Sequence, residues 1–479
     1  MGQILSRIIF FLLLISPTLS FSQYLQSTEY LGVFSKSIIT LFGLQDAKYD
    51  VDMYKVRYHT TDLNGNPVVA SGMFAVPINP TCDSLPIALY AHGTVLKRDN
   101  VPSANNPESA LGKAIASMGY IVAMPDYLGL GDLPGLHPYQ HGMSEATTSV
   151  DILRAAKEFM QDSLPIDFSN EMFLTGYSQG GHAAMATAKY IQDNQLESEL
   201  PVAGAAPLSG AYHISKRQTD ELLLDIPYDS PGYIVYLLLS FQEVYGNIFT
   251  NYSDILQSPY DTSIPPMYDG NQIISNIHAV LPNQVSQYLN PTFLNGFIAD
   301  SATKNTPMWQ ALLDNDNHDW TPQFPIKMLY CRGDQTVKPE NTLDAYDAMI
   351  ANGATAVFKE DIGDFDHGDC IIPAMLGAID YFETLRTDCD STITLVPECI
   401  CMPEGINIYP IPTRDVLNVD SWVSHTVHME IYNINGKLIY SGRVDSNTKI
   451  STTNWSTGMY TIIFSSDSYF ETKKFTITR

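Results

Sequence analysis

EMFLTGYSQGGHAAMATAKYIQD, residues 171–193, is the stretch that decides the fold, because an apolar strand pattern passes through a single serine into a helix pattern. Gly176 and Gly180 stand two positions either side of Ser178, and Gly181 follows them. A sharp turn between a strand and a helix is crowded, needs such small residues, and exposes the serine hydroxyl. The Gly-x-Ser-x-Gly pattern alone arises by chance in a chain with 30 glycines. Its strand and helix neighbours lead us to predict that Ser178 is a nucleophile and not a serine in a structural turn.

Apolar strands alternate with helical stretches on both sides of this turn. The predicted strands are 86–93, 120–127, 201–210, 325–334 and 356–361, and the predicted helices are 109–118, 145–160, 179–192, 340–351 and 371–385. Such alternation predicts an α/β fold with a mostly parallel sheet covered by helices on both faces. An antiparallel pair, 53–60 and 67–77, precedes it around the turn signal Asn64-Gly65.

The alternation stops between about residues 212 and 325. This segment is rich in Tyr, Leu and Pro and contains helix-like pieces such as DELLLDI, 220–226, and GYIVYLLLSFQEVYG, 232–246. A structureless loop of this length is uncommon inside a compact domain. We therefore predict a helical cap inserted into the α/β domain.

The first residues have the pattern of an export signal. Arg7 precedes an apolar run, Ile8–Ile15, and Pro17 and the small residues Ser20 and Ser22 follow. The run is too short to span a bilayer, so we predict a signal peptide over residues 1–22 and no transmembrane segment. A buried N-terminal helix is the alternative.

Residues 405–479 differ in character from the rest. Segments 427–442, 459–466 and 470–479 alternate with period two around Asn-Gly and Thr-Gly turns, which predicts a small antiparallel β-sandwich. Residues 387–404 carry cysteine and proline and are predicted as a linker. The α/β domain is therefore expected over residues 23–386.

A serine hydroxyl needs a base, and in this arrangement an acid and then a histidine follow the serine along the chain. His367 lies between a predicted strand and helix, whereas the other downstream histidines precede the acid or belong to the last domain. Asp334 ends a predicted strand in a turn, where a carboxylate can hold the imidazole in the required tautomer. Asp364 and Asp366 compete with it, but we interpret them as solvated loop carboxylates.

Negative charge on the reacting oxygen requires backbone donors. We predict the N–H of Gln179, directly after the nucleophile, and the N–H of Thr94, after the turn His92-Gly93. His92 itself is interpreted as a brace of that turn in preference to a second base.

Composition excludes several classes of function. The 479 residues include 52 acidic and 26 basic side chains, and the net charge of -26 repels nucleic acid and anionic membrane surfaces. Export permits disulfides among the six cysteines, and the spacing of Cys399 and Cys401 does not suit a metal site. No metal and no cofactor are expected.

Five pieces of the chain resemble, as a set, the α/β-hydrolase fold and within it the secreted lipases and esterases. They are YAHGT (90–94), MPDYLGLGD (124–132) with 137–159 following, TGYSQGGHAA (175–184), YCRGDQTVKP (330–339) and FDHGDC (365–370). The resemblance covers roughly residues 50–386 and implies Ser178, Asp334 and His367 as a triad, with Gln179 and Thr94 as oxyanion donors. Members of that fold differ most in the cap, so the resemblance does not extend to the substrate.

The C-terminal region, from IYPIPTRDVLNV at 408–419 to TKKFTITR at 472–479, resembles the sorting domain of cargo of the type IX secretion system of Bacteroidota. Ile411 stands where that family usually has asparagine. The resemblance implies carriage by that machinery across the outer membrane, cleavage of the tail, and release or surface attachment.

We therefore predict a secreted serine hydrolase that cleaves carboxylic esters through an acyl-enzyme on Ser178, with the Tyr- and Leu-rich cap favouring an apolar acyl or aromatic substrate. A serine peptidase is the closest alternative, and it needs a charged cap residue such as Glu243, Asp254 or Asp269 for the peptide terminus. A non-catalytic binding protein on the same scaffold is the other.

Cys331 and Cys370 each lie three residues from a predicted catalytic residue, Asp334 and His367. The two loops must meet for the triad to form, which brings the cysteines within bonding reach, so a Cys331–Cys370 disulfide is a further hypothesis. Two small buried residues are the alternative.

Overall fold

The computed structural model describes residues 23–41, 43–387, 406–409, 413–421, 427–433, 437–444, 447–466 and 470–478. The predicted signal peptide and all of the predicted linker except Thr387, with Cys389, Cys399 and Cys401, lie outside the described residues, as does Ile411. The chain divides into two compact units, Met1–Ser391 and Thr392–Arg479, and each is described by itself.

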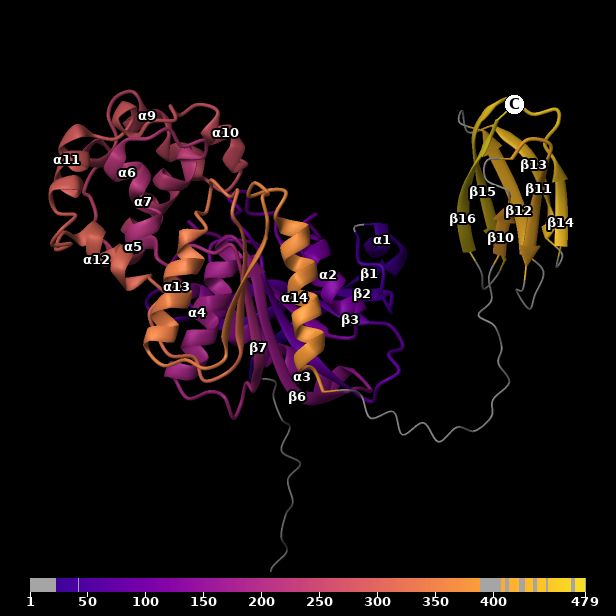
Figure 1. Ribbon diagram of the computed structural model, residues 1–479, viewed down its shortest axis with the longest axis horizontal. Coiled ribbons are helices and arrows are strands. Elements are labelled where there is room, and N and C mark those ends of the chain that lie inside the picture. Colours follow the sequence, from indigo (N-terminus) through magenta and orange to yellow (C-terminus); the bar gives the residue numbers. More distant parts are fainter. Residues whose placement is uncertain are drawn as a thin grey trace, which may run out of the picture. The chain divides into compact units, whose positions relative to one another are not determined.

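The first unit is built on a nine-stranded sheet of order β1-β2-β3-β5-β4-β6-β7-β8-β9 (Figure 1). The pairings among β1, β2, β3 and β5 are antiparallel, and every pairing from β5 through β4 to β9 is parallel. The strands are β1 (Leu25–Phe34), β2 (Val51–Thr61), β3 (Pro67–Pro77), β4 (Ser84–Ala91), β5 (Ile121–Pro125), β6 (Asp167–Tyr177), β7 (Val202–Leu208), β8 (Ile326–Cys331) and β9 (Val357–Gly363). This is the mostly parallel sheet that the alternating pattern predicts.

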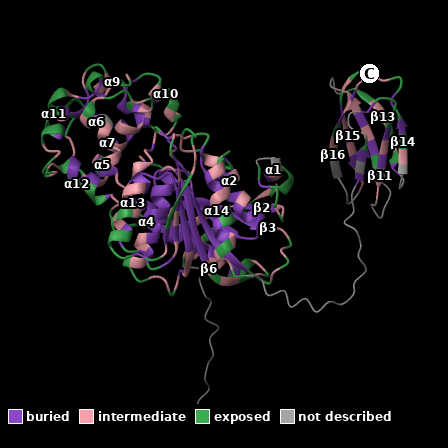
Figure 2. Ribbon diagram, viewed as in Figure 1, coloured by how far each residue is buried: buried purple, intermediate pink, exposed green. Residues whose placement is uncertain are grey.

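The central strands β3, β5, β4, β6 and β7 are largely buried, and successive side chains of a strand point to opposite faces of the sheet. In β4, Ile87 and Leu89 belong to one hydrophobic core, and Ala88 and Tyr90 belong to the other. Figure 2 shows these strands buried and the outer faces of the helices exposed. Helices α3 (Gly142–Ser163), α4 (Gln179–Asp193) and α13 (Glu340–Ala351) line the first core, and α1 (Lys36–Leu41), α2 (Ser109–Ser117) and α14 (Ile371–Leu385) line the second.

Most predicted boundaries agree with these elements, and the bounds of α13 and α14 agree in full. Three features differ. The pattern analysis does not predict β1, which is mostly exposed at the edge of the sheet and so lacks a clean apolar alternation. It also does not predict α1, and it makes α3 shorter than the observed Gly142–Ser163.

The predicted cap is present as a group of short helices and one longer helix beyond one end of the sheet (Figure 1). Its helices pack around a hydrophobic core of their own, which residues such as Tyr139 and Val337 of the α/β body join. They are α5 (Ile214–Arg217), α6 (Asp220–Leu224), α7 (Pro231–Tyr245), α8 (Tyr252–Ile255), α9 (Tyr260–Ser263), α10 (Ile274–His278), α11 (Pro291–Ala299) and α12 (Pro307–Asp314), with 3-10 turns at 265–268 and 285–287, whereas the 3-10 turn at 102–104 belongs to the α/β body.

The second unit is a sandwich of two antiparallel sheets around one apolar core, as its period-two pattern predicts. One sheet has the order β10-β11-β14 and the other β13-β12-β15-β16. The strands are β10 (Ile406–Tyr409), β11 (Val416–Ser421), β12 (Val427–Asn433), β13 (Leu438–Val444), β14 (Asn447–Ser451), β15 (Gly458–Ser465) and β16 (Phe470–Ile477). Within the described part of the chain, no helix combines the length and apolar character needed to cross a membrane.

Candidate active site

Ser178 occupies the turn between β6 and α4 with a strained backbone, φ 60° and ψ -119°. Its N–H donates to the carbonyl oxygen of Leu208, 3.0 Å away. A Cβ added at Gly176 would lie 2.4 Å from a backbone oxygen of Gly180, and one at Gly180 would lie 1.9 Å from the oxygen of Ala91. Carbon and oxygen atoms do not approach so closely, so both positions require glycine, as the turn argument expects.

The structure brings Ser178, His367 and Asp334 together. His367 Nε2 lies 2.9 Å from Ser178 Oγ, and His367 Nδ1 lies 2.6 Å from Asp334 Oδ2. A carboxylate on Nδ1 holds the proton there and leaves Nε2 free to accept the serine proton. The arrangement is chemically able to generate a serine nucleophile.

Asp334 is buried and held in one orientation. Its Oδ1 accepts hydrogen bonds from the N–H groups of Thr336 and Val337, each at 2.9 Å, so Oδ2 faces the imidazole. Asp364 and Asp366 are exposed, and Asp366 Oδ1 accepts the N–H of Asp369 at 2.8 Å. Of the three carboxylates considered, the structure therefore places Asp334 on the histidine.

The loops that carry the acid and the histidine are joined covalently. Cys331, the last residue of β8, forms a disulfide with Cys370, which directly precedes α14. The predicted Cys331–Cys370 bond is thus confirmed. Tyr177 adds a polar tie, because its hydroxyl donates to the carbonyl oxygen of His367 at 2.6 Å.

The turn after β4, where Thr94 lies, is held by buried polar groups. Glu108 accepts hydrogen bonds from the N–H of Gly93 and from the hydroxyl of Tyr90. The ring nitrogens of the fully buried His92 lie 2.7 Å from the oxygen of Gly93 and 3.3 Å from that of Asp126. These contacts of His92 with backbone oxygens hold the turn in its conformation.

A buried polar network, which the sequence patterns do not predict, lies behind Ser178. The amide nitrogen of Gln179 lies 2.6 Å from His137 Nε2 and donates to Glu145 Oε1 at 2.8 Å. The other oxygen of Glu145 lies 2.7 Å from Nδ1 of His182, one helical turn after Ser178. In the sequence, His137 lies near Glu145, and His182 lies near Ser178, which is a weak signal of polar partners. Only the packing of α3 on α4 brings the two pairs together.

Burial and charge set the protonation of this network. Burial lowers the pKa of His137 to about 4, so this ring is neutral at pH 7. Burial alone would lower the pKa of His182, but the carboxylate of Glu145 outweighs it and raises that pKa above its ordinary value. Burial likewise opposes the ionisation of Glu145, yet attraction to His182 leaves the pKa of Glu145 below its ordinary value. Both shifts favour the ionised forms of this fully buried pair.

The network also reaches the end of the cap. His182 Nε2 lies 2.9 Å from the carbonyl oxygen of Asn315, and the side-chain oxygen of Asn315 accepts the N–H of Gly142 at 2.8 Å. The hydroxyl of Ser240, on α7, donates to the carbonyl oxygen of His137 at 2.9 Å. Buried hydrogen bonds therefore connect the turn that carries Ser178 to the cap.

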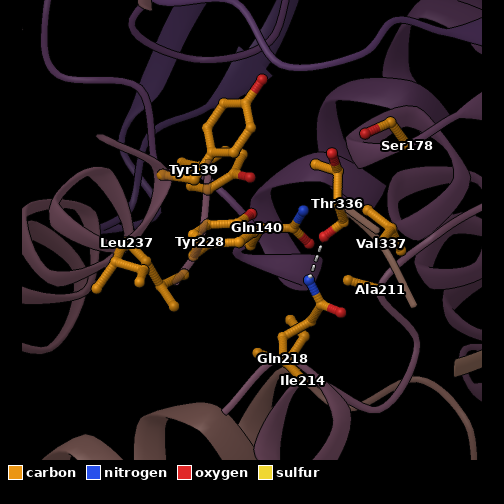
Figure 3. Close-up of a pocket in the computed structure, with 12 residues that line it drawn as sticks. Tyr139, Gln140, Ser178, Ala211, Ile214, Gln218, Tyr228, Leu237, Thr336 and Val337 are labelled. Atoms are coloured by element: carbon orange, nitrogen blue, oxygen red, sulfur yellow. Dashed lines mark hydrogen bonds between the residues drawn. The ribbon is translucent and has the colours of Figure 1, made fainter. Parts of the chain in front are cut away.

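A cavity with a free volume of about 60 Å³ opens onto Ser178 (Figure 3). The residues on its wall are uncharged and come from the body, the cap and the turn beside Asp334: Tyr139, Gln140, Ser178, Ala211, Ile214, Gln218, Tyr228, Tyr233, Ile234, Leu237, Thr336 and Val337. Stacking of Tyr139 on Tyr236, with ring centroids 4.7 Å apart, joins the body to α7 beside the cavity. The cap therefore forms part of the wall around the serine.

Solved structures similar to this chain are hydrolases. A Legionella pneumophila protein assigned as a hydrolase is 29% identical, with a TM-score of 0.70, and the match covers 76% of this chain and 98% of that one. A rice cell wall degrading esterase, LipA from Xanthomonas oryzae, is 27% identical, with a TM-score of 0.68 and the same coverage. Candida antarctica lipase A in its closed state is 16% identical, with a TM-score of 0.55 over 77% of this chain and 84% of that one, and it shows the fold alone.

Two family models match the sequence. The model described as secretory lipase matches residues 108–367, which are 260 of the 479 residues, and the secretion system C-terminal sorting domain matches residues 407–478. Among curated proteins the sequence comparison finds no match. Because the first match covers more than half of the chain, the protein belongs to the secretory lipase family, as an exported hydrolase of the lipase and esterase type that carries a C-terminal secretion sorting domain.

Proposed function

We propose that the protein cleaves carboxylic esters through an acyl-enzyme on Ser178. His367 removes the serine proton and returns it to the leaving alcohol, and Asp334 keeps the imidazole in the tautomer that can do so. Water then releases the acid with the same histidine as base. The hydrogen-bonded series Ser178–His367–Asp334 is the observation that carries the proposal.

The oxyanion of the tetrahedral intermediate would be bound by the N–H groups of Gln179 and Thr94. Gln179 is the first residue of α4, so its N–H has no acceptor within the helix. Its side chain is anchored on His137 and Glu145, which keeps this helix end in place before charge develops. Each such donor is worth about 3 to 4 kcal/mol of barrier.

The wall of the cavity favours a neutral, compact acyl group. It is uncharged, and its free volume of about 60 Å³ is small beside the cavity of about 150 Å³ that holds a benzene molecule in another protein. Acetate or butyrate esters fit such a space better than palmitate esters. Longer chains require the cap residues to move.

The peptidase alternative lacks a suitable charged group near Ser178 among the three residues considered. Asp254 accepts the N–H groups of Thr250 and Asn251, and Asp269 accepts bonds from Asn271. Glu243 is exposed and lines a different cavity. None of these contacts supports recognition of a peptide terminus.

Turnover of p-nitrophenyl acetate, butyrate, octanoate and palmitate by the wild type and by Ser178→Ala tests the proposal. We expect butyrate to exceed palmitate, and kcat to fall about a million-fold in the variant. A covalent phosphonate adduct on Ser178, located by mass spectrometry, would identify the nucleophile directly. Equal turnover by both proteins would refute the serine mechanism, and cleavage of an aminoacyl p-nitroanilide without ester cleavage would favour the peptidase.

The same sorting domain suggests the route of export. We infer that residues 405–479 address the protein to the type IX secretion machinery, which the match to a secretion sorting domain supports. Deleting this domain in a host that has the machinery should leave the hydrolase inside the outer membrane, as fractionation and immunoblotting would show. Normal secretion of the truncated protein would contradict the inference.

A further inference from the structure

A histidine and carboxylate cluster lies where the two ends of the cap meet. His213 directly precedes α5 at the start of the cap, and Asp316 and His318 follow α12 at its end. Each of the three residues offers one possible ligand atom, and these three atoms lie within 4.8 Å of one another. Helix α5 contacts both α12 and α13 in this region, and the three lie together in Figure 1.

The side chains of His213, Asp316 and His318 have the chemistry of metal ligands, and the residues around them support such a role. Asp344, on α13, accepts a hydrogen bond from His213 Nδ1 at 2.8 Å, so the other ring nitrogen, Nε2, keeps its lone pair free. Arg217 holds that carboxylate through two bonds of 2.8 and 2.7 Å. A carboxylate behind the ligating imidazole is the usual support of a histidine bound to zinc.

The other two residues lie close to His213, and each offers a possible ligand atom. Asp316 accepts the N–H and the hydroxyl of Ser215, at 2.9 and 2.6 Å, which holds its carboxylate in place. His318 Nδ1 is buried and has no hydrogen-bond partner. An unpaired buried polar atom is costly, and a bound cation would remove that cost.

We propose that His213, Asp316 and His318 bind one divalent transition-metal ion, with Zn²⁺ the expected species. Two imidazole nitrogens and one carboxylate oxygen form a ligand set common for zinc, with a fourth position for water. Ligand atoms on one zinc ion lie about 3.4 Å apart, so the three residues need only a small contraction. The rings of His213 and His318, now stacked with centroids 3.6 Å apart, must splay to aim at one ion.

The ion would join the first and last segments of the cap to each other. Through Asp344 it would also join them to α13 of the body. The three ligands do not belong to the proposed catalytic triad, so this site is separate from the proposed ester hydrolysis. Cysteine spacing alone predicts no metal site. A ligand set that combines residues 213 and 316 gives no local motif, because these residues are far apart in the chain.

Metal content of the full-length protein tests the proposal. After treatment with a chelator, dialysis against ZnCl₂ and removal of free metal, we expect one equivalent of zinc per chain by plasma mass spectrometry. Asp316→Asn keeps both contacts with Ser215, because the amide accepts the N–H and donates to the hydroxyl, and it should weaken binding at least about tenfold. His318→Ala should abolish it, and His59→Ala, at an exposed histidine on β2, should retain it.

Thermal melting gives a second readout. Zn²⁺ should raise the Tm of the chelated wild type and of His59→Ala but leave that of His318→Ala unchanged, while Ca²⁺ should raise none of them. Asp344→Asn should weaken zinc binding by about 10–100-fold, as loss of a supporting carboxylate does elsewhere. Measuring these effects also on Ser178→Ala keeps them independent of the catalytic proposal.

Folding of each variant is checked by its circular dichroism and by a cooperative thermal transition without metal. Zinc content far below one equivalent in the wild type would overturn the proposal. Equal zinc affinity of folded His318→Ala and the wild type would overturn it as well, and the cluster would then be a stacked histidine pair.

Discussion

Replacing Asp334 by asparagine should reverse the tautomer of His367. The Oδ1 atom accepts two backbone N–H groups, from Thr336 and Val337, and only an oxygen can keep both bonds. The amide nitrogen of Asn must therefore take the place of Oδ2, 2.6 Å from His367 Nδ1. There it donates to Nδ1, so the ring proton moves to Nε2 and points at Ser178 Oγ. The base can then no longer accept the serine proton.

The expected loss is about ten-thousandfold in kcat, or about 5 kcal/mol of transition-state stabilisation. Turnover of p-nitrophenyl butyrate at pH 7 by Asp334→Asn, beside the wild type, measures it. The backbone contacts are retained, so the Tm should change little. Asp364→Asn is the matched control, because that carboxylate is exposed, and it should keep near-normal turnover.

A loss of less than about tenfold in Asp334→Asn would refute the tautomer argument. A large loss in Asp364→Asn, with Asp334→Asn active, would assign the orienting acid to the histidine loop instead.

Three further perturbations have defined outcomes. Gly180→Ala should lower the stability by about 3 kcal/mol or more and remove ester turnover, because the new Cβ would lie 1.9 Å from a carbonyl oxygen; a Tm equal to that of the wild type would contradict this. Replacing Cys331 and Cys370 together by serine opens a loop with a sequence separation of 39 and should cost about 4 kcal/mol by loop entropy, measured by urea unfolding; a change below about 1 kcal/mol would contradict it. Glu145→Gln breaks a buried ion pair and should cost about 3 kcal/mol. The pKa of Glu145 is lowered from its ordinary 4.5, and that of His182 is raised from its ordinary 6.5. The difference in Tm between the variant and the wild type should therefore be largest between these two pH values and should shrink as the pH rises through the raised pKa of His182. A difference in Tm that does not depend on pH would contradict this.

Local patterns determine much of this protein. The turn between β6 and α4 is crowded and needs the small residues that stand around Ser178, and the contacts of the folded turn require the same glycines. The strands and helices after it have the lengths and apolar runs of a parallel sheet, and the period-two segments after residue 405 form the sandwich. Each of these features depends on residues close together in the chain, so it can be read from the sequence.

Features that join distant segments required the tertiary structure. Strand β1 lies exposed at the edge of the sheet, so its sequence does not alternate between apolar and polar residues. Its position is set by its pairing with β2. The sequence favours Asp334 over the acids beside His367, but only the meeting of two loops shows one carboxylate buried against the imidazole and the others facing solvent.

The same holds for the polar groups buried around the active site. Glu145 is charged and fully buried, which residue type alone would not suggest, and it is stabilised only because α3 packs on α4 and brings it to His182. The cluster of His213 with residues 316 and 318 forms because the two ends of the cap meet, where α5 contacts both α12 and α13. Sequence determined the elements and the turn around Ser178, whereas folding decided which side chains meet, because a contact between segments that are distant in the chain depends on how whole elements pack.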